Sequence, residues 1–118
     1  MWWTICGVAG ALGVAFGAFG AHSLPQMVSE ELLADAARRW DLAARYHLVH
    51  ALALGLVALH PNPPTLAGGL FVAGMVLFSG SLYTMALTNQ TWLGAVTPLG
   101  GLSWIAAWLV LAFASRTA

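Results

Sequence analysis

The chain has 118 residues, of which 60% are hydrophobic and 7% are charged, and its formal net charge is zero. Soluble domains carry roughly 25% charged residues, so this composition excludes a soluble domain and indicates an integral membrane protein. At about 20 apolar residues per membrane-crossing helix, the length predicts an all-α four-helix membrane bundle that forms one domain over residues 1–118 and is surrounded by membrane lipid. The lack of any lysine and arginine cluster in the sequence argues against nucleic acid as a partner.

The first predicted span covers residues 2–21 and interleaves glycine with apolar residues. Gly13 and Gly17 lie one helical turn apart, so they form a small-residue stripe on which another helix can pack closely. His22 follows at the membrane surface. Pro25 then ends the span, because it has no backbone N–H and biases Leu24 toward an extended conformation.

The charged residues concentrate in the first connection, from Glu30 onward, which holds all four acidic residues and three of the four arginines. Ser29 as N-cap predicts an amphipathic helix that either lies on the membrane or extends the second span, residues 41–59, into water. Basic residues are biased toward cytoplasmic loops. We therefore expect the first connection to be cytoplasmic, with both termini on the opposite side of a bacterial inner membrane.

Prolines define the second half of the chain. Residues 60–64 contain three prolines in four positions, which makes a stiff link and predicts an antiparallel hairpin of the second span with the third, residues 65–87. The fourth span is predicted over residues 92–114. Within it, Pro98 removes a backbone donor and Gly100 and Gly101 are flexible, so we expect a kink or a short unwound segment that faces the bundle interior, with these three residues as a hinge.

The polar side chains of the spans concentrate in the half of the bilayer next to the first connection, given a rise of 1.5 Å per residue. They are His22, Tyr46, His50, Ser79, Ser81, Tyr83 and Thr97. One interpretation is a ligand-binding polar cavity around His50, the readily titrating group well inside it. The other is that these groups hold the helices together by hydrogen bonds, among them one between Tyr46 and His50.

His47 and His50 form an H-x-x-H pair with His22 nearby, which raises a metal or haem site as an alternative. Real sites usually also bring a carboxylate, a third histidine or a thiolate, so we predict no cofactor. Trp104 and Trp108 form an aromatic stripe in the fourth span, suited to packing, a neighbouring subunit or a quinone. The sequence has no nucleophile–base pair and no paired intramembrane carboxylates, which argues against an enzyme.

Four motifs resemble, in order and spacing, those of the small membrane proteins called domain of unknown function 423. They are GAFGAH at residues 17–22, YHLVHA at 46–51, FSGSLY at 78–83 and TPLGG at 97–101. The resemblance covers essentially the whole chain. It implies a four-helix membrane fold and a bacterial inner-membrane location, with no chemistry to transfer.

These patterns favour a non-enzymatic membrane protein that acts through helix association. Its partner would be a second copy of itself, in a homo-oligomer, or a larger membrane protein complex of which it is an accessory subunit. The alternative function is a transporter or channel for a small solute or proton, using the polar cavity around His50 and the break at Pro98.

Overall fold

The computed structural model describes residues 1–114, which form helices joined by short connections. In chain order these are α1 (Trp2–His22), α2 (Leu24–Met27), α3 (Glu30–Leu59), α4 (Thr65–Gly74), the π-helix η1 (Met75–Gly80), α5 (Ser81–Thr88), the 3₁₀ helix η2 (Thr91–Ala95) and α6 (Thr97–Ala112). Because α4, η1 and α5 follow one another without a gap, and η2 precedes α6 closely, the described chain makes 4 rods long and apolar enough to cross a membrane. The predicted all-α four-helix membrane fold is confirmed.

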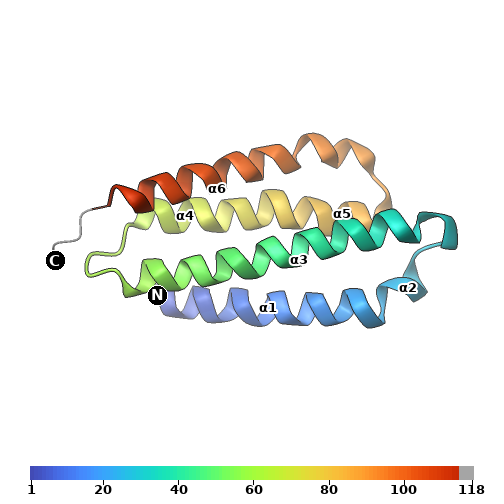
Figure 1. The fold of residues 1–118 in the computed structure, drawn as a ribbon, viewed down its shortest axis with the longest axis horizontal. Helices are drawn as coiled ribbons and strands as arrows, with labels where there is room; N and C mark the ends of the chain where they lie inside the picture. Colours follow the sequence, from blue (N-terminus) through green and yellow to red (C-terminus); the bar gives the residue numbers. More distant parts are fainter. Residues whose placement is uncertain (115–118) are drawn as a thin grey trace.

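The four rods lie side by side in the order α1, α3, α4–α5, α6 (Figure 1). The Cα atoms extend over 54 × 26 × 16 Å, so the bundle is flattened. The central rods are α3 and α4–α5, while α1 and α6 form the two edges. As a result, α1 has only two buried residues, Ala9 and Gly13.

The second rod, α3, is one continuous helix of 30 residues. At 1.5 Å per residue it is about 45 Å long, more than the roughly 30 Å of a bilayer's hydrocarbon core. Its first turns carry Glu30 and Glu31, with Ser29 at the N-cap position. Of the two predicted arrangements for the charged segment, the structure has the extension of the second span.

The connection before α3 differs from the prediction at Leu24. This residue begins the short helix α2 instead of being extended, and Pro25 occupies the first turn, where a missing N–H leaves no helical hydrogen bond unmade. Leu24 is 1% exposed and packs in a cluster with Ala36 and Trp40 of α3. Burial of this side chain explains why the segment folds back onto α3.

The fourth rod changes its helix type next to the predicted break. The 3₁₀ helix η2 ends before Val96, and Pro98 lies in the first turn of α6, so it starts a helix and does not kink one. Gly100 lies directly against the backbone of η1 at Phe78, whereas no atom lies within 4 Å of a Cβ placed on Gly101. The geometry therefore assigns Gly100 to close packing, and the hinge at Pro98, Gly100 and Gly101 stays a prediction. Residues 115–118, including Arg116 of the topology argument, lie outside the described residues.

Three tryptophan rings lie directly on glycines of neighbouring rods, where an added Cβ would overlap the indole. The pairs are Trp2 on Gly68, Trp40 on Gly20 and Trp104 on Gly74. Two of these rings also donate a hydrogen bond to the helix beneath them. Trp40 Nε1 donates to the Phe16 carbonyl at 2.6 Å, and Trp104 Nε1 donates to the Phe71 carbonyl at 3.0 Å.

The predicted glycine stripe on α1 packs only in part. A Cβ on Gly13 would lie 2.6 Å from Leu48 Cδ2, so a side chain here would displace Leu48 at the contact between α1 and α3. No atom lies within 4 Å of a Cβ on Gly17, and the close contact one turn later is made by Gly20 instead. Which glycines of α1 contact α3 depends on how α1 is rotated about its own axis, and the four-residue spacing alone does not reveal this rotation.

Replacing Gly74 by alanine is expected to lower the free energy of unfolding by about 1 to 3 kcal/mol, because the added methyl overlaps the Trp104 ring. Gly69 is the matched control, since it lies in the same helix and a Cβ there meets nothing within 4 Å. Both variants can be unfolded in mixed detergent micelles and followed by circular dichroism. Equal free energies for the two variants would contradict the ring-on-glycine contact.

Candidate functional site

The polar residues inside the bundle form several groups, and two of them are clusters built around the two histidines of α3. His47 faces α1 and α5, whereas His50 faces α6. The predicted single cavity therefore divides: Tyr83 belongs to the His47 cluster, and Thr97 lies in a third group with Ser81. The side chains differ in direction because residues three apart on a helix are offset around its axis.

His47 joins three helices. Its Nε2 lies 2.9 Å from the Ala9 carbonyl oxygen of α1, which can only accept, so Nε2 carries the proton and donates. Its Nδ1 then accepts from the Tyr83 hydroxyl of α5 at 3.0 Å. Phe16 packs edge-on against the Tyr83 ring, with centroids 4.9 Å apart. The arrangement defines a neutral imidazole whose two nitrogens are both bonded.

His50 has the opposite tautomer. Its Nδ1 donates to the Tyr46 carbonyl at 2.7 Å, and its Nε2 accepts from Trp108 Nε1 at 3.1 Å. The imidazole also stacks on Trp104, with ring centroids 3.8 Å apart and planes 4° from parallel. The predicted bond between Tyr46 and His50 is thus made by the Tyr46 backbone and not by its hydroxyl.

The hydroxyl groups of the third and fourth rods bond mainly to the backbone. Ser79 Oγ donates to the Ala43 carbonyl of α3 at 2.8 Å. Ser81 Oγ lies 2.9 Å from the Phe78 carbonyl and 2.6 Å from Thr97 Oγ1, which links α5 to the start of α6. Among residues 1–114, no buried side-chain nitrogen or oxygen is left without a partner. This pattern matches the interpretation of structural hydrogen bonding.

The metal or haem alternative would have to use residues that the fold separates. The lone pairs of His47 and His50 accept hydrogen bonds from Tyr83 and Trp108, so a metal ion would have to displace these donors. His22 is exposed at the end of α1. Within the described part of the chain, no group of three or more histidine, cysteine, aspartate and glutamate side chains is placed to hold a metal ion.

One side of the His50 cluster borders a groove between α3 and α6. The groove has a volume of about 390 Å³, and Tyr46, His50, Phe78, Trp104 and Trp108 are among the residues that line it. Tyr46 is 44% exposed, while His50 is 4% exposed. Tyr83, Ser81 and Thr97 do not line this groove. Of the predicted cavity residues, only Tyr46 and His50 are therefore brought together at one open surface.

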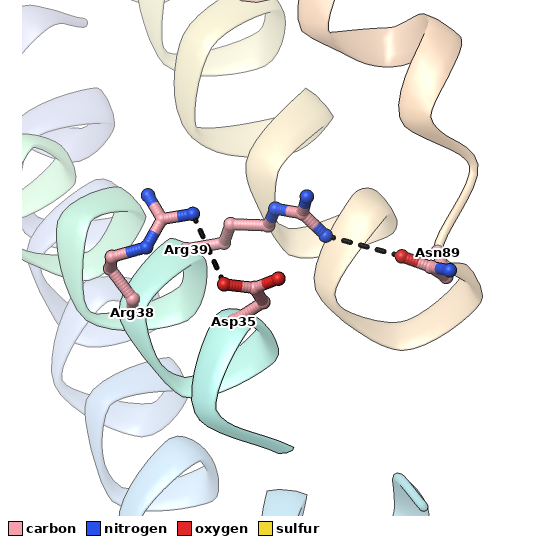
Figure 2. Close-up of polar contacts among 4 residues, drawn as sticks. All are labelled: Asp35, Arg38, Arg39 and Asn89. Atoms are coloured by element: carbon pink, nitrogen blue, oxygen red, sulfur yellow. Dashed lines mark hydrogen bonds and ion pairs between the residues drawn. The ribbon is translucent and has the colours of Figure 1, made fainter. Parts of the chain in front are cut away.

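The charged end of α3 forms ion pairs along the helix and one contact to the connection after α5, and Figure 2 shows the contacts of Arg38 and Arg39. Arg38 pairs with Asp35 at 3.6 Å, and Arg45 pairs with Asp41 at 3.0 Å, both well exposed. Exposed ion pairs contribute only about 0 to 1 kcal/mol each. Arg39 instead reaches across to the connection after α5, where its guanidinium donates to Asn89 Oδ1 at 3.3 Å.

Sequence reasoning missed the structural roles of Trp40 and His47. Trp40 belongs to the predicted amphipathic segment, but its ring packs against the Tyr83 ring, with centroids 4.5 Å apart, and its Nε1 bonds to α1. His47 was considered only as half of an H-x-x-H pair. The π-helix η1 was also missed. No local sequence signal identifies these partners, because they come from helices distant in the chain.

The fold and the two bonded histidine clusters define a class, the small multi-pass membrane proteins with four helical rods. Within this class, the chain belongs to the family described as protein of unknown function (DUF423), whose model matches residues 16–101. The predicted family resemblance is thereby confirmed, and the matched region contains both histidines of α3.

Relatives occur in bacteria and in a yeast. The chain is 41% identical over 110 residues to the UPF0382 membrane protein YwdK of Bacillus subtilis. The matched region covers 88% of this chain and 86% of the relative. It is 40% identical over 104 residues to a UPF0382 membrane protein of Staphylococcus haemolyticus, covering 85% and 82%. A relative in Schizosaccharomyces pombe is 33% identical over 116 residues, covering 92% and 96%. No solved structure matches the chain.

Replacing Tyr83 by phenylalanine is expected to lower the free energy of unfolding by about 0.5 to 2 kcal/mol, because His47 Nδ1 loses its donor inside the bundle. Tyr46→Phe is the matched control: it removes the same hydroxyl from a half-exposed ring whose hydroxyl forms none of the hydrogen bonds found among residues 1–114. Reversible unfolding in mixed micelles measures both changes. If Tyr46→Phe lowered the free energy of unfolding more than Tyr83→Phe did, the result would contradict the hydrogen bond between Tyr83 and His47.

Proposed function

We propose that the protein is a non-enzymatic membrane component that works by associating through one side of α1, with a second copy of itself as the first partner to test. The observation that carries the proposal is the exposure of this edge helix. Only Ala9 and Gly13 of α1 are buried, although the helix spans 21 residues. A membrane helix with so few buried residues leaves one side available to another helix.

One side of α1 is shaped for close approach, and toward the end of the helix it borders a hollow against α3 that Gly17 and Ala21 help to line. It consists of residues at alternating spacings of four and three, which share one side of a helix: Trp3, Gly7, Gly10, Val14, Gly17 and Ala21. No atom lies within 4 Å of a Cβ placed on Gly7, Gly10 or Gly17. Small residues let helix backbones approach in a membrane, where association depends on packing and hydrogen bonds. We call these six residues the α1 stripe.

The buried polar groups support association more than transport. A path for water, protons or a polar solute needs groups that are free to exchange partners, and such groups mark functional sites when they line a cavity. Here the polar atoms of His47 and His50 bond to neighbouring helices, as do those of Ser79. The solute or proton pathway around His50, the alternative function, therefore has less support from the geometry.

The double variant Gly10→Leu, Gly17→Leu is expected to weaken self-association at least tenfold, because the leucine side chains keep a second helix away from the α1 stripe. Gly69→Leu is the control, since Gly69 is exposed on α4 and has open space around it. Native mass measurement from a mild detergent, together with single-molecule counting in vesicles, reports the oligomeric state. A wild-type protein that is monomeric and has no partner under these conditions would refute the proposal.

We also propose that the chain lies in the bacterial inner membrane with the α1–α3 connection in the cytoplasm, because the first half of α3, next to this connection, carries three arginines and the α3–α4 connection carries none. In a Cys6→Ala background, a cysteine at Gln26 is expected to be protected in intact cells from a membrane-impermeant thiol reagent. A cysteine at Asn62 is expected to react. The reverse labelling pattern would invert the topology.

A further inference from the structure

The groove between α3 and α6 has the size and setting of a site for a lipid-soluble ligand. Its volume of about 390 Å³ falls within the roughly 300 to 1,000 Å³ of small-molecule sites. All its lining residues belong to the membrane-crossing rods, so it opens sideways toward lipid. On α3 the groove is lined by Leu42, Tyr46 and His50. Leu42 lies beside the charged end of the helix, and His50 lies about 12 Å further along the helix axis. A ligand would enter from the bilayer, next to the headgroups.

The groove wall is a set of parallel rings. The planes of Tyr46 and His50 are 13° apart, those of Tyr46 and Trp104 are 14° apart, and His50 is stacked on Trp104. Trp108 stands edge-on to His50 at 61°. Aromatic rings attract one another in offset-stacked and edge-to-face arrangements. Tyr46 is the half-exposed ring of this parallel set, so a flat ring placed on it would gain stacking that a flexible acyl chain would not.

One polar group on this wall has no internal partner. The Tyr46 hydroxyl forms none of the hydrogen bonds found among residues 1–114, while both nitrogens of His50 are engaged. A half-exposed phenol next to apolar surface usually finds a partner outside the protein, and it can donate to a carbonyl oxygen. The groove therefore suits a flat ring with a hydrogen-bond acceptor on its edge.

The neighbouring backbone keeps the groove open. The π-helix η1 places Phe78 at the groove, and π-helical turns occur frequently at functional sites. Gly100 holds α6 against η1, whereas Gly101 lines the groove with no atom within 4 Å of a Cβ. Two adjacent glycines thus have different surroundings: one is packed, and the other faces empty space.

We propose that this groove binds the ring of an isoprenoid quinone, stacked on the half-exposed Tyr46 ring, with a ring carbonyl accepting a hydrogen bond from the Tyr46 hydroxyl. The isoprenoid tail would run into the surrounding lipid. The proposal concerns binding alone and is independent of association through the α1 stripe, which is on the opposite edge of the bundle (Figure 1).

The test uses the full chain in mild detergent with ubiquinone-2 and menaquinone-2, short-tailed quinones, and native mass spectrometry as the readout. We expect saturable binding of one quinone per chain. Gly101→Leu is expected to weaken binding at least tenfold by filling the groove, and Tyr46→Phe about threefold to tenfold by removing the donor. Gly69→Leu, the matched glycine in open space on α4, is expected to bind like the wild type.

Two further measurements keep the outcome decisive. Ile105→Trp narrows the same groove from an exposed position of α6, and it replaces Gly101→Leu if circular dichroism shows that the latter does not fold. The α1 double variant is expected to bind quinone normally, which separates this test from that of association. Equal quinone binding by all groove variants, displacement of quinone by excess phospholipid, or binding of phospholipid alone would overturn the proposal.

Discussion

The packing of the four rods depends on indole rings that lie directly on glycines of other helices. Lipid tails are as apolar as leucine, so helices in a membrane associate through close packing and hydrogen bonds and not through the hydrophobic effect. Trp40 on Gly20 and Trp104 on Gly74 supply both, because each ring covers a glycine and each N–H bonds to a carbonyl of the helix beneath. Trp40 fastens α1 to α3, and Trp104 fastens α6 to α4. Each edge rod is thereby attached to the central pair.

The number of rods and their approximate ends could be predicted from sequence, because apolar runs and prolines act locally. The partners within the bundle could not. Gly13 and Gly17 are equivalent in a spacing argument, but only Gly13 contacts α3, since the rotation of α1 about its axis is set by side chains of another helix. In the sequence, His47 and His50 form an H-x-x-H pair, but spacing alone does not show which helix each side chain faces. Their hydrogen-bond partners belong to α1, α5 and α6, which no short stretch of sequence reveals.

The interior is held by backbone carbonyls as much as by side chains. His47, Ser79 and Trp104 each donate to a main-chain oxygen of another helix. Such acceptors have a fixed position, so they hold the imidazole of His47 in one tautomer and orientation. A core of this kind leaves few polar groups for outside ligands. The exposed Tyr46 hydroxyl and the uncovered side of α1 are accordingly where interactions with other molecules are most readily made.

The π-helix η1 also sets the register of everything that follows it in its rod. A π-helical turn closes over one residue more than an α-helical turn, and each residue of an α-helix advances by about 100° around the axis. Without the extra residue, α5 would be rotated by that angle, and Tyr83 would point away from His47. The length of the segment from Met75 to Gly80 is thus as constrained as its composition, and a single-residue deletion there would uncouple α5 from α1 and α3 without touching either.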